Sequence, residues 1–470
     1  MLVIMSDLHL TDGSSGKTIP PLAFRIFRQR LRDLAYDASW RSTPDGTGVY
    51  QPIEKLDIIL LGDILDVIRS DKWLKNNPQN VRPWDVEKRA AQVAQKVEEI
   101  TDLILHNNNS SFEVLRHLNK ANNTDSLNWI TIPPARDGKP DPAVPWEPKD
   151  RRRVSVKVDI HYMVGNHDWF YHLGGSAYDA MRKKIVDALG LTNDPAVPFP
   201  HDPSESAKIP AVLREHRVFA RHGDIFDAFN YDKQNGRDAS SLGDAIVIEL
   251  LNRFPSEVAK LELLPDSVKA GFKEIDNVRP YELIPVWIDG LLQSYHVNRP
   301  QRKEVMRIWD RLVDDFLGLD FVKRQASFWN PLNAVTQLRM ALKFSQGVSL
   351  GLVSWAINRF RTDPVQKFES YFKNALTEVA FKNQQAKHIV YGHTHHQEIV
   401  PLDVVPQATA ADLTQIYFNS GTWRTVHEKA LAQPNSELFV TYQVMTYFAF
   451  FKDDERGGRP FECWSGTLGL

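Results

Sequence analysis

Metal-binding and acid–base side chains stand in five short clusters along the chain, which read SDLH, GDILD, GNHD, RHGD and GHTHH. Donor atoms suited to metal ions occur at seven positions in these clusters: Asp7, His9, Asp63, Asn166, His222, His393 and His395. Mixed oxygen and nitrogen donors favour Mn, Fe or Zn over Ca, which prefers oxygen ligands alone. Seven donors exceed one tetrahedral site, so two divalent or trivalent metal ions that share a bridging carboxylate are the economical interpretation.

Such a pair of ions predicts a particular chemistry. Two ions about 3.5–4 Å apart clamp both non-bridging oxygens of a phosphoryl group. A water that bridges them becomes acidic enough to supply hydroxide near neutral pH. Attack of that hydroxide on phosphorus hydrolyses a phosphoester or phosphoanhydride, so the sequence predicts an enzyme.

Each cluster has a simpler interpretation when it is taken alone. Asp7 and His9 fit an ordinary turn at a strand end, and Asp63 fits the N-cap of a helix. His222 fits a packed core histidine. The three histidines of GHTHH are hard to explain without a metal, and the clusters taken together favour metal binding.

The elements that must position these side chains are short apolar runs, each followed at once by one of the clusters. Runs of β-branched and large apolar residues predict buried strands. They span Leu2 to Met5, Leu56 to Leu61, Val158 to Val164, Arg217 to Ala220 and His388 to Tyr391. Helical periodicity between them, as from Ala90 to Ile104, favours an α/β fold, in which ligands gather where strands end.

Local spacing suggests how the donors reach one cavity. In Asp7-x-His9 and His393-x-His395, an extended backbone would place both side chains on the same side. A glycine precedes the donors in three clusters, where it would allow the chain to turn away from the sheet.

These motifs, in this order, resemble those of the calcineurin-like metallophosphoesterase superfamily. The resemblance covers the regions around residues 1–70, 155–230 and 385–425, and implies an αββα sandwich. It implies that Asp7, His9 and His395 bind one metal ion and that Asn166, His222 and His393 bind the other, with Asp63 as the bridge. It further implies that His167 donates a proton to the leaving group or steadies the phosphoryl oxygen, that Asp168 orients His167, and that Asp66 and Asp224 hold ligand histidines in place.

Other segments do not follow the strand–helix alternation. Residues 107 to 155 are rich in Asn, Pro and charge and predict a long surface loop. Residues 230–385 predict a large all-helical insertion, including the apolar run VSLGLVSWAI, between two parts of a core at 1–229 and 386–470. Strands are again expected in IYFNSGTW and ELFVTYQVMTYFAFF.

Arg424, in NSGTWR, has two interpretations. One is a core strand in which Trp423 packs and Arg424 is solvated. The other is contact between Arg424 and a substrate phosphate. The first is the simpler.

The substrate class stays open between alternatives. A phosphorylated small molecule or nucleotide fits a site whose helical insertion sets substrate choice. The chain also has some similarity to the UDP-2,3-diacylglucosamine pyrophosphatase branch, which would imply a lipid-linked nucleotide. A nuclease is disfavoured because the net charge of −2 gives no broad attraction to nucleic acid. A non-catalytic binding scaffold on the same fold is the alternative of another class.

The composition and the apolar runs bear on the cellular location of the protein. The single cysteine, Cys463, excludes an intrachain disulfide and fits a reducing compartment. No apolar run reaches the roughly 18 residues that span a bilayer, and the opening MLVIMSDLHL lacks a basic segment of the signal-peptide kind. A cytoplasmic location is therefore expected, with peripheral membrane contact left open.

Overall fold

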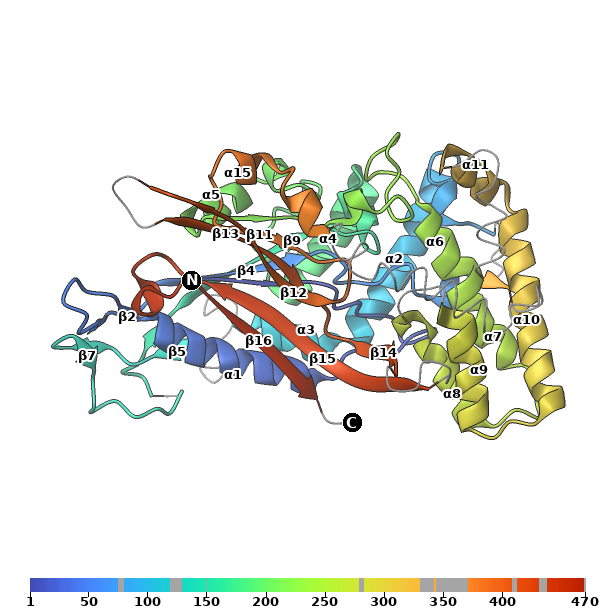
Figure 1. The fold of residues 1–470 in the computed structure, drawn as a ribbon, viewed down its shortest axis with the longest axis horizontal. Coiled ribbons are helices and arrows are strands. Elements are labelled where there is room, and N and C mark those ends of the chain that lie inside the picture. The colour runs from blue at the N-terminus through green and yellow to red at the C-terminus, as the bar shows by residue number, and fades with distance from the viewer. Residues whose placement is uncertain are drawn as a thin grey trace.

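The structure is a computed structural model of the chain. It describes residues 1–74, 80–118, 129–148, 150–278, 283–329, 342–343, 371–407, 412–430 and 438–468. The fold is mixed α/β and contains two main sheets with helices packed around them (Figure 1).

The larger sheet has six strands and carries three of the polar clusters. Its strand order is β14-β15-β1-β4-β9, with β16 paired to β15. Strands β1, β4 and β9 run parallel, whereas β15 runs antiparallel to β1. The bounds are Leu2–Met5 for β1, Lys55–Leu61 for β4, Lys157–Met163 for β9, Thr425–Lys429 for β14, Phe439–Phe450 for β15 and Phe461–Leu468 for β16.

The smaller sheet carries the other two clusters. Its order is β10-β11-β13-β12, and β10, β11 and β13 run parallel. The bounds are Val218–Ala220 for β10, His388–Tyr391 for β11, Gln397–Val405 for β12 and Leu413–Ser420 for β13. All five strands expected before the clusters are thus confirmed, as are the two expected near the C-terminal end.

The apolar runs form strands because both of their faces are buried. Alternate residues of β1 belong to different clusters: Leu2 and Ile4 join an apolar cluster shared with β10, β11 and β13, whereas Val3 and Met5 join a cluster shared with helices. Strands buried on both faces read as continuous apolar sequence. The two sheets therefore share one apolar layer between them.

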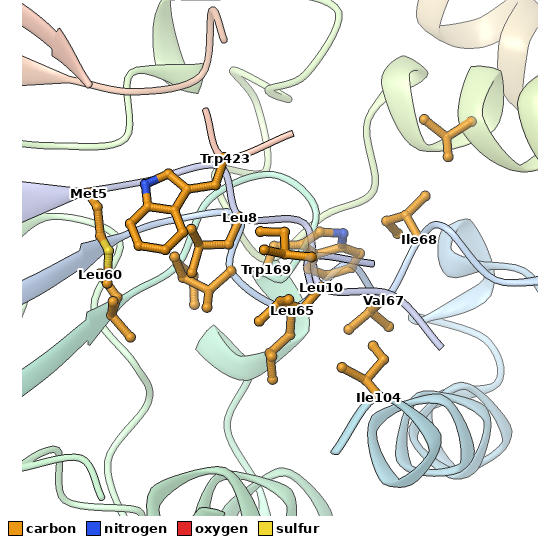
Figure 2. Packing of buried hydrophobic residues seen from close by; sticks show 14 of the residues in the cluster. Met5, Leu8, Leu10, Leu60, Leu65, Val67, Ile68, Ile104, Trp169 and Trp423 are labelled. Carbon is orange, nitrogen blue, oxygen red and sulfur yellow. The ribbon is translucent and has the colours of Figure 1, made fainter. Parts of the chain in front are cut away.

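Helices cover the outer faces of both sheets. The long pattern expected from Ala90 is confirmed as α2. Four helices share the apolar cluster of the larger sheet: α1 (Pro21–Ala38), α2 (Ala90–Asn107), α3 (Asn109–Arg116) and α4 (Ser176–Leu189). Figure 2 shows part of this cluster, in which Leu8, Trp169 and Trp423 lie among side chains that follow the strand ends. Near the smaller sheet lie α5 (Ile209–Glu215) and α15 (Val379–Lys382).

Helix α3 corrects one expectation. It lies within residues 107 to 155, which we expected to be largely loop. Phe112 and Leu115 are buried there, and α3 packs between α1 and α4. Only two large apolar residues at helical spacing mark it in the sequence, so tertiary packing decides its conformation. The described remainder, from residue 129, forms short two-residue strands and turns.

The helical segment forms one end of the molecule, green to yellow in Figure 1. Regular helix begins at Leu242 rather than at residue 230. Its elements are α6 (Leu242–Ile246), the π-helical turn η7 (Val247–Asn252), α7 (Arg253–Val258), α8 (Asp266–Gly271), the 3₁₀ turn η8 (Phe272–Asn277), α9 (Ile284–Ser294), α10 (Arg299–Gly318) and α11 (Asp320–Trp329). Residues 330–341 and 344–370, including VSLGLVSWAI, lie outside the described residues.

This helical segment shares its core with the rest of the chain. Leu250, Phe254 and Trp309 belong to the same apolar cluster as Ile68 and Ile104. An isolated bridge also pairs Val278 with His427 of β14. Among the described residues, no helix combines the length and the apolar character that crossing a membrane requires.

Candidate metal centre

The structure brings all seven predicted donors to one place. They follow the carboxyl ends of β1, β4, β9, β10 and β11, so two sheets contribute to a single site. Asp7, His9, Asp63, Asn166 and His222 are buried, and His393 and His395 are half-buried. Three overlapping groups of His and Asp side chains are positioned to hold a metal ion. The first and the second of those described below contain the predicted donors, and another, which links them, consists of His9, Asp63 and His167.

The first group contains Asp7, His9 and His395. His395 Nε2 lies 2.9 Å from His9 Nε2 and 3.3 Å from Asp7 Oδ1. His9 Nε2 lies 3.7 Å from Asp7 Oδ1 and 3.6 Å from Asp63 Oδ2. Donor atoms that share an ion at about 2.1 Å lie roughly 3.0–3.4 Å apart in octahedral or tetrahedral geometry. The separations from His395 Nε2 lie close to this range and those from His9 Nε2 to the two carboxylates are slightly wider, so a small inward shift of the donors would let them share one ion.

The second group contains Asp63, His222 and His393, and Asn166 completes it. Asn166 Oδ1 lies 3.2 Å from His222 Nε2 and 2.9 Å from His393 Nδ1. His222 Nε2 lies 3.4 Å from Asp63 Oδ2. The same carboxylate oxygen of Asp63 thus faces nitrogen atoms of both groups.

One oxygen of Asp7 gives a second observation that fits a cation. Its Oδ1 atom is buried and makes no hydrogen bond of ordinary geometry within the described part of the chain. A buried carboxylate oxygen without a hydrogen bond costs free energy unless a cation compensates it. The chemistry of the donor set and this oxygen both fit a metal ion.

The backbone at the donors differs from the extended form that we expected. Asp7, His9, Asp63, His393 and His395 all have left-handed φ angles, between 45° and 71°. Strand β1 has already ended, and the turn is fixed by hydrogen bonds from Asp7 N to the Gly62 carbonyl (3.1 Å) and from His9 N to the Asp63 carbonyl (2.9 Å). Residues other than glycine adopt this region at a cost, and such residues cluster at functional sites.

At two of the glycines expected to permit turns, neighbouring atoms lie too close to leave room for a side chain. A Cβ atom at Gly165 would lie 2.7 Å from His222 Nε2 and would collide with Asp63 Oδ1. Gly62 has φ of +84°, and a Cβ atom there would lie 2.5 Å from His222 Nδ1. The donors can converge because these two positions lack a side chain.

The charges of the site are coupled. Burial raises the pKa of Asp63, but the nearby His222 and His167 outweigh burial and hold that pKa below its usual range. Burial lowers the pKa of His222, but Asp63 outweighs it and the pKa is raised well above its ordinary value. Without metal, a proton on His222 thus helps to balance Asp63, and a bound metal ion would replace that proton.

His167 is held by Asp66 rather than by Asp168, which corrects the expected role of Asp168. His167 Nδ1 lies 2.8 Å from Asp66 Oδ1, and Asp66 Oδ2 lies 3.0 Å from His9 Nδ1. Burial disfavours the charged imidazole of His167, but Asp66 and Asp63 raise its pKa to about 10. Asp66 therefore orients two histidines, including the one expected to bind metal.

Asp168 shapes the GNHD turn instead. Its carboxylate accepts hydrogen bonds from Gly165 N (2.6 Å), Ile64 N (2.9 Å) and the Tyr162 hydroxyl (2.6 Å). Burial and the nearby Asp63 raise the pKa of Asp168 to about 6. Its side chain ties the turn after β9 to the turn after β4.

Asp224 also differs from its expected role of holding a ligand histidine. His222 Nδ1 donates to the Leu61 carbonyl at 2.9 Å. Asp224 pairs with His201 at 2.8 Å and with the buried Arg237. It stabilises the loop behind His222 and acts on that ring through its charge.

Two supporting residues were not expected from the sequence. Asp227 Oδ2 lies 3.1 Å from His393 Nε2 and accepts a hydrogen bond from Asn230 Nδ2 at 2.9 Å. Asn166 Nδ2 in turn donates to Asn230 Oδ1 at 3.3 Å. These residues orient His393 and Asn166, and no periodicity or strand-end position marks them in the sequence.

Arg424 differs from the simpler of its two interpretations. Trp423 is buried and its ring packs against Phe24 and Phe27 as expected, but it lies in the bend between β13 and β14 rather than in a strand. Arg424 is also buried rather than solvated, and its Nη1 atom lies 2.6 Å from Asp276 Oδ2 of the helical segment. Contact with substrate stays a prediction.

The site therefore contains a full set of donors, supporting carboxylates and a separately held histidine. Its chemistry follows from these atoms and their distances. No protein-family model and no curated protein matches the chain.

Proposed function

We propose that the chain is a phosphoric ester hydrolase that depends on two metal ions. The observation that carries the proposal is the position of Asp63 Oδ2, which lies 3.6 Å from His9 Nε2 and 3.4 Å from His222 Nε2. One carboxylate placed between two donor groups is the arrangement that a two-metal site needs. The two packed sheets with outer helices support a metallophosphoesterase-type αββα sandwich as the scaffold.

The donor groups define which residues would hold each ion. Asp7, His9 and His395 would bind one ion, Asn166, His222 and His393 the other, and Asp63 both. The mixture of imidazole, carboxylate and amide donors suits Mn, Fe or Zn. When bound, the ions would neutralise phosphoryl oxygens and acidify water.

The chain's own residues would complete the reaction. With Nδ1 of His167 held by Asp66, the ring has Nε2 left to meet the substrate. The Asp66 carboxylate beside Nδ1 favours the protonated ring, in which Nε2 carries a proton. It can then donate that proton to the leaving oxygen as the bond to phosphorus breaks.

Metal titration and a substrate panel test the proposal. Metal-free protein is titrated with Mn, Zn and Fe, and the loaded protein is then assayed with phosphomonoesters, phosphodiesters and nucleoside diphosphate-linked lipids. We expect two ions bound per chain and hydrolysis of one of the three classes. Asp63→Ala should lose both, whereas Asp45→Ala, in an exposed turn, should keep both. A wild-type protein that binds no transition metal would refute the proposal.

A further inference from the structure

The turn that follows Asp66 connects the candidate site to the helical segment. Asp66 contacts His9 and His167 through its two oxygens. Oδ1 of Asp66 also accepts a hydrogen bond from Arg69 N at 3.0 Å. The position of Asp66, and so of both imidazole rings, depends on the backbone from Ile68 to Ser70.

Asn252, in the helical segment, forms hydrogen bonds with this turn. Its Nδ2 atom donates to the Ile68 carbonyl at 2.9 Å and to the Ser70 carbonyl at 3.1 Å. Its Oδ1 atom accepts from Arg69 Nη1 at 2.7 Å. Asn252 is 1% exposed and ends the π-helical turn η7, a conformation frequent at functional sites.

Further contacts from the helical segment secure Arg69. Its Nη2 atom donates to the Lys273 carbonyl at 3.3 Å, and its Nε atom lies 3.9 Å from Asp276 Oδ2. The same oxygen of Asp276 contacts Arg424 Nη1 at 2.6 Å. The side chains of Arg69 and Asp276 are fully buried and that of Arg424 nearly so, and these contacts are therefore shielded from water.

We propose that Asn252 is a positioning residue of the candidate site: it fixes the turn from Ile68 to Ser70, the turn fixes Asp66, and Asp66 fixes the His167 ring. The inference rests on the proposed function, in which His167 protonates the leaving group. The helical segment then acts on the proton-transfer step as well as on substrate choice. Loss of the Asn252 side chain removes three hydrogen bonds that hold this turn against the helical segment, so the turn becomes free to shift.

Leaving groups of different basicity make this role measurable. An aryl phosphate with a poor leaving group needs protonation by His167, whereas p-nitrophenyl phosphate needs it far less. For Asn252→Ala we expect the ratio of kcat for phenyl phosphate to kcat for p-nitrophenyl phosphate to fall by roughly tenfold, as a small displacement of a catalytic group would cause. A lower fraction of folded protein would reduce both rates equally and leave the ratio unchanged.

Trp309→Phe is the matched control. Like Asn252, Trp309 is buried in the helical segment. The substitution also removes a hydrogen bond, the one from Trp309 Nε1, but that bond is made to the Leu342 carbonyl and not to the turn. The control should keep the wild-type ratio. Should Asn252→Ala fail to fold, Arg69→Lys keeps the charge, removes the contacts to Asn252 and the Lys273 carbonyl, and should lower the ratio in the same way.

A measurement without catalysis separates this inference from the proposed function. In metal-free protein, the proton between His167 Nδ1 and Asp66 should give a downfield resonance that His167→Gln removes. Asn252→Ala should shift or broaden that resonance, and Trp309→Phe should not. A changed resonance in a protein whose wild type hydrolyses no phosphoester would support positioning and refute the phosphoesterase. An unchanged resonance and an unchanged kcat ratio in an active protein would overturn the positioning role alone.

Discussion

Asp66 divides its two oxygens between two histidines with different tasks. One oxygen orients His9 toward the other donors, and the other orients His167, which belongs to neither set of proposed ligands. A single carboxylate therefore sets the angle between a metal ligand and a proton donor. Orienting partners of this kind are needed because an imidazole ring can otherwise rotate away.

Replacing His167 separates proton donation from metal binding. For His167→Ala we expect kcat with a poor leaving group to fall about 10²-fold or more, the usual contribution of a general acid. Metal content measured on the purified variant should match that of the wild type. His106→Ala, in which an exposed histidine of α2 is removed, is the control and should leave both quantities unchanged. Unaltered turnover in His167→Ala would remove this residue from the mechanism.

Gly165 tests the packing of the donors. A methyl group there would collide with Asp63 and His222, so Gly165→Ala should weaken metal affinity by about 10–100-fold, as found when ligand orientation is disturbed. Gly174→Ala is matched to it, because a Cβ atom at Gly174 meets no atom within 4 Å. Isothermal titration with Mn measures both. Equal affinities for the two variants would contradict the close approach seen at Gly165.

At the scale of elements, the sequence predicts the strands well and the turns poorly. Strands β1, β4 and β9 are recognisable because burial on both faces demands continuous apolar runs. The left-handed turn at Asp7 is not recognisable, because the Gly62 carbonyl that fixes it lies far along the chain. The predicted partner of His167 was wrong for the same reason. Asp66, which contacts His167 in the structure, is 101 positions away from it in the sequence, whereas the predicted partner, Asp168, is the adjacent residue.

Elements without a strong local signal were also missed. Helix α3 depends on packing against α1 and α4, and its Asn and Ser residues favour a loop when considered alone. Asp227 and Asn230 lie beyond the polar cluster after β10, in a loop with no periodicity. Supporting residues of a site are set by three-dimensional contacts, so spacing cannot identify them.

Strand β11 carries a buried histidine that should make stability depend on pH. His388 packs against the rings of Phe418, Phe450 and Phe461, and burial lowers its pKa to about 3. Between that value and the ordinary 6.5, the unfolded chain binds a proton at His388 that the folded chain does not. The free energy of unfolding must therefore fall as the pH falls through this window.

The variant His388→Phe should reduce this pH dependence. Urea unfolding at pH 7 and pH 4.5 should show a loss of stability that is smaller in the variant than in the wild type by on the order of 3 kcal/mol. The comparison between proteins cancels the titration of other groups. Equal losses in both proteins would mean that His388 is not buried in its neutral form.

At the scale of the whole molecule, one apolar cluster runs from the helices on the larger sheet into the helical segment. A destabilising substitution in either part should therefore destabilise the other part as well. This continuity distinguishes the segment from a cap that is joined to its core only by linkers.

Calorimetry tests that continuity. We expect a single cooperative transition in which the calorimetric and van't Hoff enthalpies agree. Saturating Mn should raise the transition temperature, since a ligand at 100 times its Kd adds about 2.7 kcal/mol of stability. EDTA should reverse the rise, and Asp63→Ala should not respond to Mn. Two separate transitions would show that the helical segment unfolds independently.

Selection would treat the donor positions differently from the rest of the chain. Each of five donors combines a reactive side chain with the left-handed backbone that suits glycine best. In a laboratory library screened only for heat resistance of the metal-free protein, glycine and asparagine should accumulate at Asp7, His9, Asp63, His393 and His395. A natural lineage that no longer needed the metal ions would accumulate the same substitutions. The metal-binding side chains would be lost first, and the surrounding fold would remain.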